Sequence, residues 1–124
     1  MAAAFLKKVL NTAALLTLMT GAGAAFAHAH LEQATPAADS TVNSVNELRL
    51  VFSEGVEQAF TQVVISHDQA PVPVSSIKTE PGNKKTLIVT PAQPLPAGTY
   101  NVKWNAVSVD THKSAGDYSF TVSN

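Results

Sequence analysis

Apolar and polar residues alternate in three segments of the chain, and this pattern constrains the fold more than any other feature. Alternation with a period of two is typical of a β-strand that buries one face. Two further runs, residues 61–66 and 86–90, are rich in β-branched and apolar residues and are also strand candidates. The apolar positions of the three alternating segments are Leu48, Leu50 and Phe52, then Tyr100, Val102, Trp104 and Ala106, then Tyr118, Phe120 and Val122.

No segment after residue 27 keeps a helical period, so the sequence predicts an all-β domain. Strands separated by turn residues over about 100 residues favour an immunoglobulin-like β-sandwich. A small closed barrel is the structural alternative. Residues 66–85 carry the weakest strand signal, and Pro71 and Pro73 restrict that stretch to an edge strand or a loop.

Residues 1–27 have the features of a cleaved export signal. Lys7 and Lys8 precede an apolar run over residues 9–19, and Ala25-Phe26-Ala27 forms a small-x-small cleavage site. An uncleaved anchor or a buried helix is the alternative, but the apolar run is too short and too interrupted for a good membrane span. We therefore expect a signal peptide at 1–27 and a single exported domain at 28–124, with His28 as its first residue.

The composition narrows the classes of function. The 124 residues include no Cys, which excludes a disulfide framework and a cysteine metal site. Eight basic residues stand against nine acidic ones, a balance that does not indicate nucleic-acid binding. Cleavage after Ala27 would also remove Met1 and Met19, so the processed domain would contain neither thioether nor thiolate.

Two elements of the processed domain have metal-binding chemistry. A terminal His28 offers its free amine and its imidazole Nδ1, which together close a chelate ring on one ion. In Asp110-Thr111-His112 the first and third residues would share one face of a strand, side by side. Together they supply three nitrogens and one oxygen, a set that suits Cu(II), although Zn²⁺ accepts the same atoms in a tetrahedral arrangement.

The remaining candidates have weaker signals. Glu54 follows an early strand, where it is either a turn carboxylate or a group that orients a ligand through a hydrogen bond. His30 is either a supporting surface residue or a further contributor to the site, and His67 is expected to be solvated. Trp104 is expected in the core, on the strand that leads toward Asp110.

Several motifs resemble the CopC family of periplasmic copper-binding proteins, and within it the YobA type. The resemblance spans nearly the whole processed chain. The motifs, as they stand here, are His28-Ala29-His30-Leu31, Thr35-Pro36-Ala37, Leu50-Val51-Phe52-Ser53-Glu54-Gly55-Val56-Glu57, Leu95-Pro96-Ala97-Gly98-Thr99-Tyr100, Ser108-Val109-Asp110-Thr111-His112-Lys113, and Gly116 with Tyr118-Ser119-Phe120-Thr121-Val122.

The resemblance implies a Greek-key sandwich of about seven strands that binds one Cu(II) per chain in the periplasm. It places the copper ligands at His28, Asp110 and His112, with Glu54 in support. It also implies a protein that buffers or delivers copper, with a CopD-type inner-membrane protein as a plausible partner. We expect the chain to be a monomer. Some family members hold Cu(I) in a Met-rich loop, but the corresponding residues 66–78 contain no Met, so we expect a protein specific for Cu(II).

Two other functions stay open at this point. Copper held by a terminal histidine also occurs in polysaccharide monooxygenases, which would make the protein an enzyme. A short chain with few aromatic residues is poorly suited to bind polysaccharide, so we expect no enzymatic activity. The third possibility is an immunoglobulin-like interaction module without metal, in which His28, Asp110 and His112 occur together by chance.

Overall fold

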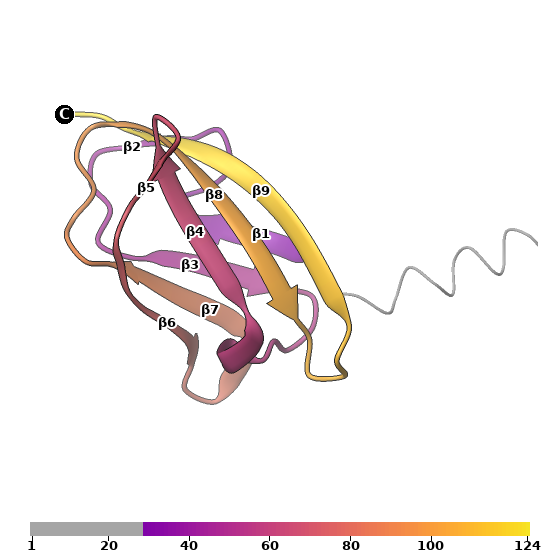
Figure 1. The fold of residues 1–124 in the computed structure, drawn as a ribbon. Coiled ribbons are helices and arrows are strands. Elements are labelled where there is room, and N and C mark those ends of the chain that lie inside the picture. Colours follow the sequence, from indigo (N-terminus) through magenta and orange to yellow (C-terminus); the bar gives the residue numbers. More distant parts are fainter. Residues whose placement is uncertain (1–28) are drawn as a thin grey trace, which may run out of the picture.

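The computed structural model describes residues 29–124, which form two β-sheets packed face to face (Figure 1). The first sheet has the order β1-β3-β7-β6 and the second the order β2-β9-β8-β4-β5. A 3₁₀ turn, η2 (Gln58–Phe60), precedes β4, and no helix in this part of the chain is long and apolar enough to cross a membrane. The strands are β1 (Leu31–Thr35), β2 (Thr41–Val42), β3 (Leu48–Phe52), β4 (Gln62–His67), β5 (Ala70–Pro71), β6 (Val74–Glu80), β7 (Asn83–Pro91), β8 (Gly98–Val107) and β9 (Lys113–Val122).

This strand order is that of an immunoglobulin-like Greek-key sandwich. The first sheet reproduces the A-B-E-D order of that fold, and the chain crosses between the sheets after β1, β2, β3, β5 and β7. Within residues 29–124, seven strands have five or more residues, while β2 and β5 have two each. The predicted sandwich of about seven strands is therefore confirmed, and the closed barrel is excluded because the two sheets remain separate.

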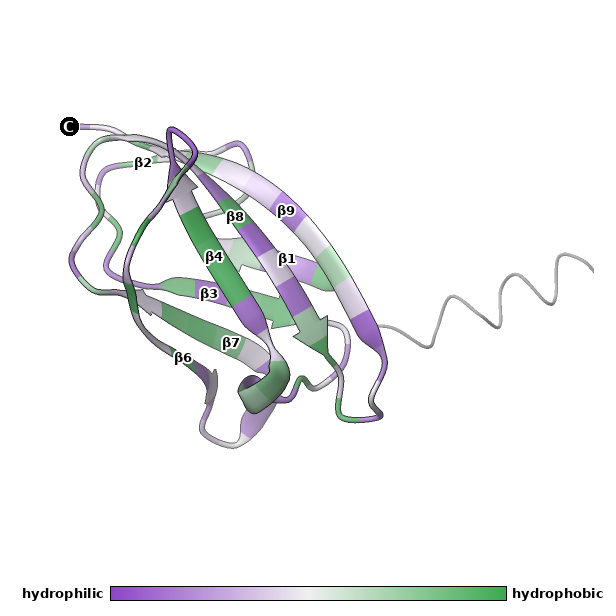
Figure 2. Cartoon of the chain, in the orientation of Figure 1, coloured by the Kyte–Doolittle hydropathy of each residue, from purple (hydrophilic) through white to green (hydrophobic). Residues whose placement is uncertain are grey.

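The alternation in the sequence becomes the two faces of each strand. Figure 2 shows hydrophobic and hydrophilic residues taking turns along β8, whose buried and more exposed positions alternate in the same way. Trp104 on β8 is buried as expected, and its ring meets Phe52 of β3 edge to face at 5.2 Å, which joins the two sheets. Gly116 on β9 makes room for this ring, because a Cβ there would lie 2.6 Å from Trp104 Cζ2.

A tyrosine corner fixes the approach to β8, and the sequence analysis did not anticipate it. The hydroxyl of the buried Tyr100 donates a hydrogen bond of 2.6 Å to the Pro96 carbonyl, four residues upstream. This is a recognised feature of immunoglobulin-like sandwiches at the start of the equivalent strand. His67 stacks on the Tyr100 ring at 5.0 Å, so the half-exposed imidazole packs against the corner rather than being simply solvated.

The sequence predicts an edge strand or a loop around Pro71 and Pro73, and the structure has the edge strands β5 and β6 there; residues 66–85, expected to be the most loop-like part, contain both of them and the beginning of β7. β6 is an edge strand that pairs only with β7, and no residue of it is fully buried. A strand that buries so little needs no alternation of apolar residues, and its sequence gave no signal for that reason. β1, the opposite edge of the same sheet, went unpredicted for the same cause.

The two buried tyrosines provide a test of the corner. Tyr118 is also buried, burial raises its pKa, and its hydroxyl has no hydrogen-bond partner within the described residues. We expect Tyr100→Phe to lower the free energy of unfolding by about 1 kcal/mol, since it removes a satisfied hydrogen bond. Tyr118→Phe should leave that free energy unchanged or raise it, because it removes a polar group that is buried without a partner.

Urea unfolding followed by the fluorescence of Trp104 measures both variants against the parent chain. Equal losses of stability in Tyr100→Phe and Tyr118→Phe would show that the hydrogen bond to Pro96 contributes nothing of its own.

Candidate metal centre

Asp110 and His112 lie in the turn between β8 and β9, at one end of the sandwich (Figure 1). The prediction that they share a face of a strand is wrong, because the strand pairing ends at Val107 and Lys113. Ser108 N donates to the His112 carbonyl at 2.9 Å, and Thr111 N donates to the Ser108 carbonyl at 2.8 Å. Thr111 has a positive φ of 70°, so the backbone reverses there and the residues on either side of it come together.

The turn brings the two side chains together nonetheless. His112 Nδ1 lies 3.2 Å from Asp110 Oδ2, and about half of each side chain is exposed. Two ligand atoms that each lie about 2.0–2.2 Å from one ion at a right angle are separated by about 3 Å. The spacing therefore suits adjacent ligands of a metal as well as it suits the direct contact between the two side chains that the structure has.

Ser108 orients the carboxylate, and the sequence analysis missed its role. Its side chain is fully buried, donates a short hydrogen bond to Asp110 Oδ1, and accepts one of 3.2 Å from His112 N. The Ser108 hydroxyl, and after it the His112 imidazole, lower the pKa of Asp110 below its usual range. Because Oδ1 is engaged by Ser108, Oδ2 is the oxygen that faces His112. A hydroxyl residue two positions before an acidic turn residue was the available sequence signal.

The beginning of the described chain is held at the same end of the sandwich. Ala29 is fully buried, and its carbonyl accepts a hydrogen bond of 2.7 Å from Ser114 Oγ. His30 N donates to Ser53 Oγ at 2.9 Å, and Ser53 N donates back to the His30 carbonyl at 2.8 Å. Ser114 stands two residues after His112, so the anchored segment and the turn are neighbours.

The other predicted site residues fall in different places. His28 lies outside the described residues. Glu54 is exposed in the loop after β3 and makes no hydrogen bond or ion pair within residues 29–124, so its supporting role stays a prediction. His67 pairs with Tyr100 at the far end of β4 and β8, remote from His112.

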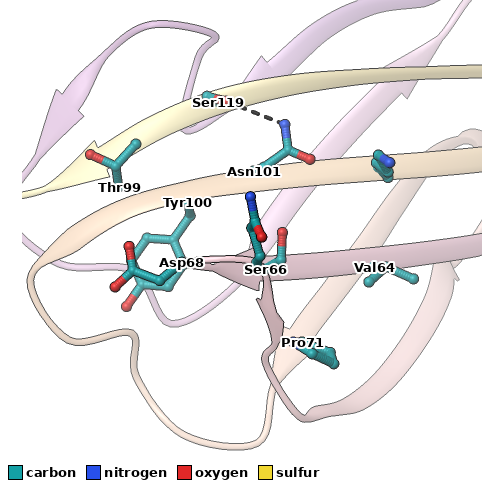
Figure 3. Close-up of a pocket in the computed structure, with 10 residues that line it drawn as sticks. Val64, Ser66, Asp68, Pro71, Thr99, Tyr100, Asn101 and Ser119 are labelled. Atoms are coloured by element: carbon teal, nitrogen blue, oxygen red, sulfur yellow. Dashed lines mark hydrogen bonds between the residues drawn. The ribbon is translucent and has the colours of Figure 1, made fainter.

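A shallow hollow of about 720 Å³ also lies away from the turn, on the outer face of the second sheet (Figure 3). Short polar side chains line much of it, among them Ser66, Asn101 and Ser119, and Asn101 donates to Ser119 Oγ at 3.3 Å. Neither Asp110 nor His112 borders it. Size alone therefore does not locate the candidate centre, which is defined by its ligand chemistry.

The described residues bring two candidate metal-ligating side chains, those of Asp110 and His112, together at the turn. Within residues 29–124, no group of three or more His, Cys, Asp or Glu side chains is placed to hold a metal ion.

Comparisons with known proteins identify a family that this chain matches. Residues 31–123 match the CopC domain family. Copper resistance protein C of Escherichia coli is 39% identical over 124 residues, covering 92% of this chain and 98% of that protein. Protein YobA of Escherichia coli strain K12 is 40% identical over 115 residues, covering 88% of this chain and 90% of that protein.

Solved structures agree with the sequence matches. PcoC of Escherichia coli, described as a methionine rich copper resistance protein, has a TM-score of 0.71 and 36% identity, covering 78% of this chain and all of that one. CopC of Methylosinus trichosporium OB3b has a TM-score of 0.70 and 32% identity, with 77% of this chain and 93% of that one covered. Because the domain match spans nearly all of the described residues and the relatives align over most of their lengths, the chain belongs to the CopC family.

Proposed function

We propose that the exported chain, processed to begin at His28, binds one Cu(II) in the periplasm and buffers or delivers it. The ligands are the amine and Nδ1 of His28, a carboxylate oxygen of Asp110 and an imidazole nitrogen of His112. The observation that carries the proposal is the Asp110–His112 pair, whose facing atoms are 3.2 Å apart. The hydrogen bond from Ser114 to Ala29 supports it, because Ala29 is the residue bonded directly to His28.

The donor set fits Cu(II). Three nitrogens and one oxygen in a tetragonal arrangement are typical of Cu(II), which also has the highest affinity among the common divalent first-row metals. The carboxylate of Asp110 reduces the charge of the bound ion, an effect that favours the doubly charged state. The pKa of Asp110, lowered by Ser108 and His112, keeps that carboxylate ionised well into the acid range.

A binding role agrees better than an enzymatic one with the distribution of aromatic residues. The described residues include six aromatic residues, and of these only Phe60 is exposed, with 68% of its surface accessible. A polysaccharide-binding face built on exposed aromatic rings is therefore missing from this part of the chain. We propose no catalytic role for the copper. We also propose that the chain is a monomer and that its partner is a CopD-type inner-membrane protein.

The first prediction concerns the terminus. Either His28→Ala or one extra residue before His28 removes part of the chelate, and we expect a loss of Cu(II) affinity of about 100-fold or more, since changes even in groups that only orient ligands cost about 10- to 100-fold. A competition titration with a chelator of known affinity measures the loss. One extra residue after Asn124 is the matched control and should have no effect, whereas wild-type affinity in the His28 variants would contradict the ligand assignment.

The second prediction concerns pH. Cu(II) must displace the proton of the terminal amine, whose ordinary pKa is about 7.7–8.0, so affinity should fall as pH drops from 8 to 5. Asp110 should add nothing to this slope, because its lowered pKa keeps it ionised throughout that range. Asp110→Asn is therefore expected to weaken binding at every pH and to leave the slope unchanged.

A slope that disappears in Asp110→Asn would mean that the carboxylate itself takes up the proton in this range. Affinities measured by competition at half-unit pH intervals distinguish the two results.

The third prediction concerns oxidation state. Residues 28–124 contain no Met or Cys, and soft sulfur ligands are those that favour Cu(I). We expect reduction of the bound Cu(II) by ascorbate to release the copper to a Cu(I) chelator, with one equivalent recovered. Retention of Cu(I) by the chain against that chelator would show a Cu(I) site that the sequence does not explain.

A further inference from the structure

The processed terminus His28-Ala29-His30 could bind a metal in a second way, which depends on whether its main-chain nitrogens are free in the folded chain. A free tripeptide with His in third position can hold Cu(II) or Ni(II) in a plane of four nitrogens. These are the terminal amine, the main-chain nitrogens of the second and third residues, and the imidazole of the third. Each main-chain nitrogen loses its hydrogen to water as a proton when it binds. Square-planar nitrogen coordination suits both metals.

We infer that Ser53 and Ser114 prevent this four-nitrogen chelate in the folded chain and so reserve the terminus for the site at Asp110 and His112. The inference deepens the proposed function, because both require a chain that begins at His28. The two serines act as positioning residues: they hold the main chain and are not themselves ligands.

Both polar groups of the peptide unit between Ala29 and His30 are hydrogen-bonded to serine side chains. Its carbonyl oxygen, on Ala29, accepts the hydrogen bond of 2.7 Å from Ser114 Oγ. Its N–H, on His30, donates the hydrogen bond of 2.9 Å to Ser53 Oγ. The C=O and N–H groups of a trans peptide point in opposite directions. Ser53, which follows β3 of the first sheet, and Ser114, on β9 of the second, therefore bind this peptide unit from opposite sides.

Ser53 makes a second hydrogen bond to His30, through its main-chain nitrogen. The His30 carbonyl accepts from Ser53 N at 2.8 Å, which places the N–H and C=O of His30 on one side, as in a strand. The hydrogen of the His30 nitrogen is therefore directed at Ser53 Oγ. A planar chelate needs the nitrogens of Ala29 and His30 both directed at one ion.

Formation of the chelate would therefore break the hydrogen bonds to Ser53 and Ser114 and turn the peptide over. It would also move Ala29, which is fully buried. With the His30 nitrogen withheld by Ser53, the four-nitrogen plane cannot be completed, and the terminus binds through the two nitrogens of His28. Two positions in the plane of the ion are left for Asp110 and His112.

Nickel alone is the probe for the first test, because square-planar four-nitrogen Ni(II) is diamagnetic and has a characteristic d–d band in the visible range that octahedral Ni(II) lacks. We expect the processed wild-type chain to give no such band when folded and to give it when unfolded in urea. The band in the folded wild type would overturn the inference. Its absence in the unfolded chain would overturn it as well, since the tripeptide would then lack the capacity that the fold is said to block.

A double variant assigns the effect to the two hydroxyls. We expect the folded Ser53→Ala, Ser114→Ala chain to form the band, and the addition of His30→Ala to abolish it. Ser44→Ala, which changes an exposed serine away from this segment, is the matched control and should behave as wild type. A folded double variant without the band would overturn the role of the serines. If the variant does not fold by circular dichroism, the folded and unfolded wild type still decide the matter.

These outcomes are separate from those of the proposed function. Unchanged Cu(II) affinity in His112→Ala would refute the copper site at the turn. The Ni(II) comparison would still show whether the folded main chain withholds its nitrogens.

Discussion

The hydrogen bond from Ser114 to the Ala29 carbonyl is the contact on which the account depends. It joins the first described residue to the beginning of β9, two residues from His112. The complete burial of Ala29 means that this attachment is part of the core and not a surface contact. The N-terminal segment is thereby held beside the β8–β9 turn, and a terminal His28 is joined by one peptide bond to a fixed position.

The tyrosine corner, which supports the fold, and the candidate metal centre lie at different ends of the sandwich. The tyrosine corner between Tyr100 and Pro96 lies at one end of β8, whereas the turn with Asp110 and His112 lies at the other. At the turn, Ser108 orients the carboxylate and lowers the pKa of Asp110. Serine hydroxyls thus fix both the turn and the N-terminal segment, and each does so from a strand or a strand end. The turn that carries the proposed ligands Asp110 and His112 is thereby held in a defined geometry.

The sequence predicted those parts of the structure in which burial repeats with a fixed period. β3, β8 and β9 alternate buried and exposed residues, and the core position of Trp104 followed from the same pattern. The edge strands β1 and β6 bury too little to leave such a pattern. At the site, the pairing of Asp110 with His112 was predicted, but for the wrong reason, since a turn with positive φ at Thr111 brings them together. The serines were missed because a small hydroxyl residue gains its role only from distant partners in the fold.

Electron paramagnetic resonance of one equivalent of Cu(II) on the untagged chain, with its start at His28 confirmed by intact mass, is the most direct test of the proposed copper site. We expect a single tetragonal species with three nitrogens and one oxygen, whose nitrogen couplings change in His112→Ala. Absence of binding, or a spectrum that is the same in His112→Ala, would contradict the proposed site.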